Sequence, residues 1–174
     1  MTFEASSPSD VALVHPLTAP ANVTIQLPGS KSLTNRALLC AALAEGRSQL
    51  SGVLFADDTR AMLHAVSGVG AQLEIDESAN TVAVTGTDPR VTTPTAHVDA
   101  DQSGTTSRFI LPALGLSPGR SVVDGSAQLR GRPFGPLIDA LRSVGVRVDE
   151  LGEPGYLPVS VTGPTRGGSV ELPG

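Results

Sequence analysis

The sequence is poor in aromatic residues, which make up 3% of its 174 residues and include no tryptophan. Proteins that bind single-stranded nucleic acids stack the bases on aromatic side chains and follow the phosphates with basic ones. The net charge of this chain is −5 at neutral pH, so its composition indicates no nucleic-acid partner. Because 40% of the residues are hydrophobic, we expect a packed globular protein with an aliphatic core.

Further absences concern cysteine, membrane spans and targeting signals. A single cysteine, Cys40, excludes an internal disulfide and a metal site built from several cysteines, and the histidines show no metal-ligand spacing. No apolar run approaches the roughly 18 residues that a membrane span needs. Residues 1–10 lack the basic start and apolar stretch of a secretory signal. We therefore expect a cytoplasmic protein with no metal site and no membrane contact.

Two short segments recur in the same order, which indicates an internal repeat. Residues 69–74 (VGAQLE) return as residues 144–149 (VGVRVD), and residues 82–86 (VAVTG) return as residues 159–163 (VSVTG). The order of these matches predicts that one supersecondary unit occurs twice.

Both copies are predicted to have the element order β-α-β-α-β-β, and hence an α/β fold of repeated βαβαββ units. In the first copy, residue alternation and helical spacing predict strands at 23–27, 49–53, 71–75 and 81–85 and helices at 32–45 and 57–66. In the second copy, they predict strands at 97–100, 120–123, 146–150 and 157–161 and helices from about 105 and at 133–144.

Apolar residues at helical spacing predict the buried faces of the helices. For the first helix they are Leu33, Ala37, Cys40, Ala41 and Ala44, which makes Cys40 a packing residue. For the last helix they are Phe134, Leu137, Ile138, Leu141 and Val144. We expect Asp57 or Asp58 to cap the second helix and Pro133 to lie in the first turn of the last one.

The repeat predicts the domain organisation. Residues 1–22 form an N-terminal segment, 23–95 the first unit, 96–165 the second unit and 166–174 the start of a third. The chain's last residues, SVELPG, echo TIQLPG at positions 24–29, where the first helix is about to begin. We therefore expect the N-terminal part of a longer protein.

Residues 28–32 (PGSKS) open the first predicted helix and form a candidate anion site. A helix N-terminus presents unpaired backbone N–H groups and a partial positive charge. Lys31, Ser32 and Arg36 can converge on one phosphate or carboxylate, because residues four apart are neighbours on a helix surface. The segment is not a Walker A loop, since no glycine directly precedes the lysine. The alternative is an ordinary capped helix with a basic surface.

Residues 27–46 (LPGSKSLTNRALLCAALAEG) resemble the signature of the 5-enolpyruvylshikimate-3-phosphate (EPSP) synthase family of the shikimate pathway. The family motif reads Leu-Pro-Gly-Ser-Lys-Ser, followed by Asn-Arg-Ala-Leu. This resemblance implies that Lys31 contacts both shikimate 3-phosphate and phosphoenolpyruvate and acts in catalysis. It also implies that Ser32 and Arg36 bind shikimate 3-phosphate.

A second motif, DQSGTTSR at residues 101–108, resembles the family's phosphoenolpyruvate-binding segment Asn-Ala-Gly-Thr-Ala-Met-Arg. The resemblance assigns Gly104 to phosphoenolpyruvate and makes Thr105 and Arg108 further candidates. A side chain at Gly104 would crowd a ligand at this helix start. Three positions depart from the family pattern. Gln102 replaces asparagine, Ser103 replaces alanine, and Phe109 stands where proline is usual. These differences affect the shape of the pocket and its sensitivity to glyphosate, the family's inhibitor. The alternative interpretation of residues 101–108 is an ordinary loop-to-helix turn.

Two more segments match the family. Arg132, within LRGRP at residues 129–133, matches a phosphoenolpyruvate-binding arginine. The guanidinium fork suits this role because it can bind a carboxylate or phosphate through two parallel hydrogen bonds; the alternative is a solvated basic turn. Asp57 and Asp58 with Arg60 match Asp-Asp-Xaa-Arg. We interpret the two aspartates as a helix cap, with Asp58 as a secondary site candidate.

The resemblance implies a two-domain α/β enzyme in which each domain contains three βαβαββ units. Its reaction moves the enolpyruvyl group of phosphoenolpyruvate to the 5-hydroxyl of shikimate 3-phosphate and releases phosphate, without a metal or organic cofactor. In the family, the residues before Gly29 supply a strand to the opposite domain. The resemblance also implies that the full-length protein is a monomer. We expect the present chain alone to be inactive.

Two alternatives remain open. UDP-N-acetylglucosamine enolpyruvyl transferase shares the repeat fold, but it has Lys-Asn where this chain has Lys31 and Ser32, and it typically carries a reactive loop cysteine in its second repeat. The other alternative is a non-catalytic binding module of the same fold, or a subunit that needs a partner chain.

Overall fold

The computed structural model describes residues 15–88 and 95–171 as an α/β fold with two sheets. The first sheet has the order β1-β3-β2 and is antiparallel throughout; its strands are β1 (Arg47–Ser51), β2 (Gln72–Asp76) and β3 (Thr81–Thr85). The second sheet has the order β4-β5-β7-β6; its strands are β4 (His97–Asp99), β5 (Arg120–Asp124), β6 (Arg147–Glu150) and β7 (Val159–Thr162). Only β4 and β5 are parallel neighbours.

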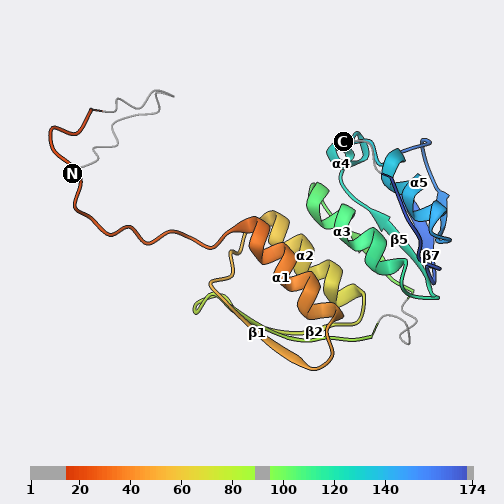
Figure 1. Ribbon diagram of the computed structural model, residues 1–174, viewed down its shortest axis with the longest axis horizontal. Coiled ribbons are helices and arrows are strands. Elements are labelled where there is room, and N and C mark those ends of the chain that lie inside the picture. The colour runs from red at the N-terminus through yellow and green to blue at the C-terminus, as the bar shows by residue number, and fades with distance from the viewer. Residues whose placement is uncertain (1–14, 89–94, 172–174) are drawn as a thin grey trace.

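The helices of the described residues are α1 (Lys31–Leu43), α2 (Asp57–Gly68), α3 (Gly104–Leu114), α4 (Ala127–Arg130) and α5 (Gly135–Ser143). Helices α1 and α2 lie side by side over the first sheet, and α3 lies between α2 and the second sheet (Figure 1). Both units contribute to one hydrophobic core, because Leu38 and Met62 belong to the same buried cluster as Ile110 and Val159. None of these helices is long and apolar enough to cross a membrane.

The predicted element order is confirmed except at its two ends and for an additional short helix, α4, in the second unit. Residues 23–27 form no strand and extend away from the helices (Figure 1), with Val23, Ile25 and Leu27 between 71% and 78% exposed. An alternating segment becomes a strand only when another strand pairs with it, and no described strand does so here. Residues 166–171 likewise form no strand, and residues 172–174 lie outside the described part of the chain.

The predicted buried face of the first helix is wrong in part. Leu33 is 70% exposed and Cys40 is exposed, so Cys40 is not a packing residue. The residues that α1 buries are Thr34, Asn35, Leu38, Ala41 and Ala42. The helix buries polar Thr34 because its hydroxyl accepts a hydrogen bond from the backbone N–H of Leu54.

Two predicted helix starts also differ. Ala56, and not an aspartate, is the N-cap of α2, and Asp57 and Asp58 lie in its first turn, where carboxylates favour the helix dipole. Helix α5 begins at Gly135, so the proline in its first turn is Pro136 and not Pro133. The short helix α4 was not predicted. The apolar stripe of α5 is confirmed, with Phe134, Ile138 and Leu141 buried and Leu137 and Val144 packed against the core.

Candidate functional site

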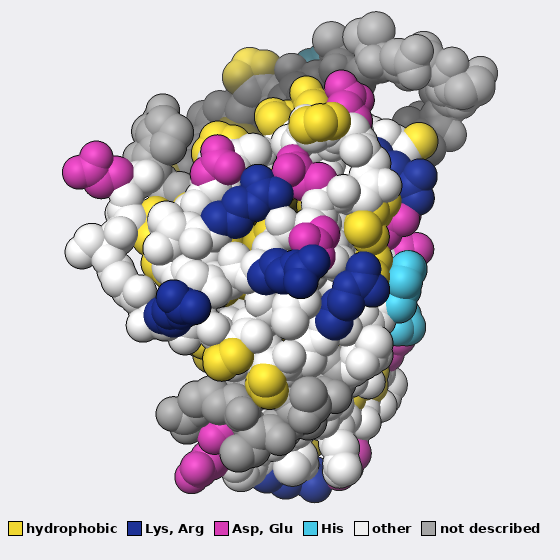
Figure 2. All heavy atoms as spheres, turned by 90° about the vertical axis from the view of Figure 1, so that its right-hand side faces the viewer, with side chains coloured by type: hydrophobic (Ala, Val, Ile, Leu, Met, Phe, Trp, Pro, Cys, Tyr) yellow, Lys and Arg dark blue, Asp and Glu magenta, His cyan; other side chains and the backbone are white. Residues whose placement is uncertain are grey.

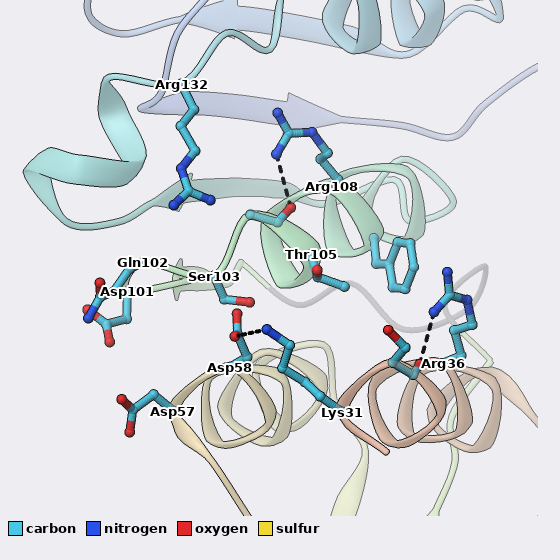
Figure 3. Close-up of a pocket in the computed structure, with 13 residues that line it drawn as sticks. Lys31, Arg36, Asp57, Asp58, Asp101, Gln102, Ser103, Thr105, Arg108 and Arg132 are labelled. Atoms are coloured by element: carbon cyan, nitrogen blue, oxygen red, sulfur yellow. Dashed lines mark hydrogen bonds and ion pairs between the residues drawn. The ribbon is translucent and has the colours of Figure 1, made fainter. Parts of the chain in front are cut away.

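The starts of α1, α2 and α3 meet at a cavity of about 570 Å³ (Figure 3). Every site residue predicted from the sequence lines this cavity: Lys31, Ser32, Arg36, Asp58, Gly104, Thr105, Arg108 and Arg132. The cavity has further lining residues: Asp57, Asp101, Gln102, Ser103 and Phe109. The sequence linked Gln102, Ser103 and Phe109 to the shape of the pocket, and it assigned neither Asp57 nor Asp101 to the site. Segments that are far apart in the sequence thus share one site.

Equivalent serine caps begin the two helices that carry the motifs. The Ser30 hydroxyl accepts a hydrogen bond from the backbone N–H of Leu33 at the start of α1, and the Ser103 hydroxyl accepts one from that of Thr106 at the start of α3. Each cap fixes where its helix begins and leaves other first-turn N–H groups for an anion. The two halves of the site are therefore built in the same way.

Lys31, the only lysine in the sequence, forms an ion pair across the cavity. Its Nζ lies 2.7 Å from Oδ2 of Asp58. The hydrogen bond from Lys31 holds the pKa of Asp58 below its ordinary value, and a hydrogen bond from Ser103 and the charge of Arg132 act in the same direction against partial burial. Asp58 therefore lines the cavity in contact with Lys31. Its preferred interpretation as a helix cap is wrong, because the N-cap of α2 is Ala56.

The arginines that line the cavity have no carboxylate partner among the described residues, whereas most arginines outside the cavity have one. Within residues 15–88 and 95–171, Arg36, Arg108 and Arg132 form no ion pair. Five arginines outside the cavity do, and their pairs are Arg47–Glu74, Arg60–Glu77, Arg130–Asp124, Arg142–Glu150 and Arg147–Asp149. Figure 2 shows acidic side chains next to basic ones over one face of the molecule. Arg120 and Arg166 of the described residues also form no ion pair, but they do not line the cavity, where three such arginines lie together.

Gly104 allows two of these arginines to approach the start of α3. A Cβ added at Gly104 would lie 2.8 Å from Nη1 of Arg108 and 2.9 Å from Nη1 of Arg132. Arg108 also donates hydrogen bonds to the backbone carbonyls of Gly104 at 3.3 Å and Pro133 at 3.2 Å. The absence of a side chain at this position thus leaves room for both guanidinium groups.

Chemically, the cavity combines cationic side chains with two helix N-termini, which suits phosphate and carboxylate groups. Lys31 and Arg36 approach it from α1, whereas Arg108 and Arg132 lie on the side of the second unit (Figure 3). Cationic side chains therefore line the cavity from both units. No group of three or more His, Cys, Asp or Glu side chains in the described residues could hold a metal ion.

Comparison with known proteins identifies the family. A sequence profile described as EPSP synthase (3-phosphoshikimate 1-carboxyvinyltransferase) matches residues 17–174. The chain belongs to the EPSP synthase family. It is 42% identical to the 3-phosphoshikimate 1-carboxyvinyltransferase of Ralstonia nicotianae over 148 residues. The aligned region covers 85% of this chain and 34% of that protein. It is also 39% identical over 177 residues to the pentafunctional AROM polypeptide of Scheffersomyces stipitis, covering 94% of this chain and 11% of the polypeptide.

A solved structure supports the same assignment. The EPSP synthase of Acinetobacter baumannii matches 81% of this chain with a TM-score of 0.74 and 30% sequence identity, over 32% of its own length. The α/β fold of the EPSP synthases, with mixed sheets and helices, is thereby confirmed. The chain spans about a third of the length of the EPSP synthases that it matches.

Proposed function

We propose that this chain is the N-terminal part of an enzyme that transfers the enolpyruvyl group of phosphoenolpyruvate to the 5-hydroxyl of shikimate 3-phosphate and releases phosphate. The observation that carries this proposal is the convergence of Lys31 and three arginines without ion-pair partners on one cavity. Membership of the EPSP synthase family supports the identity of the two anions.

The proposed binding roles follow the two halves of the cavity. Shikimate 3-phosphate would bind to the residues from α1, which are Lys31, Ser32 and Arg36. Phosphoenolpyruvate would bind to Lys31 and to residues from the second unit, which are Gly104 and Arg132, with Thr105 and Arg108 beside them. Lys31 belongs to both sets, so the proposal places the reacting groups next to its ammonium group.

The proposed reaction is an addition followed by an elimination. The 5-hydroxyl oxygen loses its proton and bonds to C2 of phosphoenolpyruvate, while C3 gains a proton, which gives a tetrahedral phospho-ketal. C3 then loses a proton and phosphate leaves C2, which restores the double bond. Bringing two polyanions together is unfavourable in water, and fixed cations offset this repulsion and orient the substrates. Lys31, oriented by Asp58, is the group of this chain that could move a proton.

The test is the transferase activity of the gene product that carries this sequence, followed by release of phosphate from phosphoenolpyruvate in the presence of shikimate 3-phosphate. Lys31→Met keeps the length of the side chain and removes its charge, so we expect activity to fall by at least a hundredfold. Arg147→Met is the matched control, because Arg147 pairs with Asp149 outside the cavity. An active Lys31→Met enzyme would contradict the proposed role, and a wild-type enzyme without activity would contradict the function.

The proposal also covers the organisation and setting of the protein. We infer that residues 23–95 and 96–165 are successive units of a larger, monomeric cytoplasmic enzyme, and that glyphosate inhibits it. Size-exclusion chromatography, cell fractionation and inhibition kinetics with the gene product test these points separately.

A further inference from the structure

Every phenylalanine in the described residues lies against an arginine. The distances from the ring centroid to the arginine Cζ are 5.4 Å for Phe109 and Arg36, 4.5 Å for Phe134 and Arg108, and 5.7 Å for Phe55 and Arg60. A guanidinium group is attracted to the face of an aromatic ring at such distances. In a chain with 3% aromatic residues, this arrangement singles out the arginines concerned.

The three arginines differ in their other contacts. Arg60 also forms a two-pronged pair with the carboxylate of Glu77, with N–O distances of 2.6 and 2.8 Å. Arg36 and Arg108, which line the anion cavity, have no carboxylate partner in residues 15–88 and 95–171. A carboxylate would orient a guanidinium but would also cancel its charge, whereas a ring face orients it and adds no negative charge.

We propose that Phe109 and Phe134 are positioning residues that hold Arg36 and Arg108 at the cavity without neutralising them. The inference deepens the proposed function, on which it rests for the identity of the anions. Phe109 then acts on shikimate 3-phosphate, the substrate assigned to Arg36, through the arginine and not by direct contact.

Arg36 depends on its ring more than Arg108 does. The Arg36 side chain donates one hydrogen bond, from Nη1 to the backbone carbonyl of Ser32 at 3.0 Å. Arg108 has two backbone carbonyl acceptors in addition to its ring. Because Arg36 is on α1 and Phe109 is on α3, their contact also links the two halves of the cavity. We therefore expect the loss of the Phe109 ring to free the Arg36 side chain.

The choice of variants follows from burial. Phe134 is 1% exposed and belongs to the core, so its replacement would perturb the fold. Phe109 and Phe55 are both partly buried against the core, and Leu can replace either ring with an apolar side chain. Phe109→Leu removes a ring that faces the cavity, and Phe55→Leu removes one that stacks on a neutralised arginine outside it. The second variant is the matched control for the first.

The experiment is an NMR titration of the full 174-residue chain with shikimate 3-phosphate and, separately, with inorganic phosphate. In Phe109→Leu we expect the Arg36 Nε–Hε signal to lose its ring-current shift and the Kd for shikimate 3-phosphate to rise about fivefold. In Phe55→Leu only the Arg60 signal should move, with both Kd values unchanged. Phe109→Tyr keeps a ring and should restore the wild-type Kd.

A double-mutant cycle separates positioning from a general effect on the fold. Arg36→Lys keeps the charge but lacks the planar group that stacks. If Phe109 acts through Arg36, Phe109→Leu should change the Kd less than twofold in the Arg36→Lys background. Additive effects, or an unmoved Arg36 signal in Phe109→Leu, would overturn the proposal. If the wild-type chain binds phosphate but not shikimate 3-phosphate, the assignment of this substrate to Arg36 fails. The Kd values for inorganic phosphate then decide whether Phe109 positions Arg36.

Discussion

The ammonium nitrogen of Lys31 lies 2.7 Å from the carboxylate of Asp58, and this ion pair ties the start of α1 to the start of α2. The hydroxyl of Thr106 in α3 donates a hydrogen bond to the backbone carbonyl of the same aspartate, at 3.2 Å. Asp58 therefore connects both helices that carry the family motifs. Its carboxylate orients Lys31 and also offsets part of the positive charge in the cavity.

Replacing Asp58 by Asn is expected to separate these two effects. The charge on Lys31 is then no longer offset, and a charge pair at about 4 Å in water is worth about 1 kcal/mol. We therefore expect the chain to bind inorganic phosphate about fivefold more tightly in Asp58→Asn, measured by calorimetry at low ionic strength. Transferase activity of the full-length gene product should fall, because Lys31 is no longer held in place.

Asp57→Asn is the matched control for this change, because it alters the net charge equally but removes no ion pair of Lys31. We expect a smaller gain in phosphate affinity and little loss of activity. Weaker phosphate binding in Asp58→Asn would show that orientation of Lys31 outweighs its charge.

The same ion pair predicts how the stability of the chain depends on pH. The pKa of Asp58 lies below its ordinary value of 3.8, chiefly because of the hydrogen bond from Lys31. A carboxyl group whose pKa is lower in the folded state stabilises the fold above the unfolded-state pKa, and this stabilisation is lost as the pH falls through the folded-state pKa. We expect the ¹³C signal of the Asp58 carboxyl group to titrate below pH 3.8 in the wild type and at higher pH in Lys31→Met. An unchanged titration midpoint in Lys31→Met would contradict this cause.

The sequence carried most of the information about the site. Gly104 and Arg132 belong to different segments that resemble motifs of the family, and both line the cavity. The motifs could not show that Asp58 faces Lys31, since this contact depends on how α2 packs beside α1. Local signals for Asp58 indicate a helix start, which is correct to within one turn but says nothing about its partner.

The errors in the fold have a similar origin. Residues 23–27 alternate as a strand does, but a strand also needs a pairing partner, which a local pattern does not reveal. Cys40 and Leu33 are apolar at helical spacing, yet α1 buries Thr34 and Asn35 instead. Thr34 points inward because it accepts a hydrogen bond from the backbone N–H of Leu54, a tertiary contact that no periodicity encodes.

We predict that replacing Asn35 by an apolar residue increases the stability of the fold. It is fully buried, and neither polar atom of its side-chain amide has a hydrogen-bond partner among the described residues. An unsatisfied buried polar group costs about 1–3 kcal/mol. We therefore expect Asn35→Leu, which keeps the number and branching of the side-chain heavy atoms, to raise the free energy of unfolding by about 1 kcal/mol, measured by urea denaturation.

Thr34→Val is the contrasting variant. The Thr34 hydroxyl accepts a hydrogen bond from the backbone N–H of Leu54 at 3.2 Å, so its loss should destabilise the fold by about 1 kcal/mol. If Asn35→Leu lowered the stability as Thr34→Val does, the amide of Asn35 would have a partner beyond the contacts described here.

The 174-residue chain by itself is expected to bind either substrate weakly and to catalyse no measurable transfer. It spans about a third of the EPSP synthases that it matches, and a site for two polyanions needs groups on every side of them. Lys31 provides a direct measurement, because reductive ¹³C-methylation gives a single lysine signal in this sequence. We expect shikimate 3-phosphate to shift that signal only at high concentration. Detectable transfer by the purified chain would refute this prediction.

Gly104→Ala is predicted to weaken phosphoenolpyruvate binding without affecting the fold. The new methyl group would lie 2.8–2.9 Å from Nη1 of Arg108 and of Arg132, and both atoms are at the ends of flexible side chains that can move. The fold should therefore keep its stability, while both guanidinium groups shift away from the anion; we expect a rise of about tenfold in the Kd, which corresponds to about 1.4 kcal/mol. Gly135→Ala is the matched control, because Gly135 also begins a helix but a Cβ there meets only Gly155 at 3.9 Å. An unchanged Kd in Gly104→Ala, or an equal rise in Gly135→Ala, would show that the two arginines do not bind phosphoenolpyruvate from the positions described here.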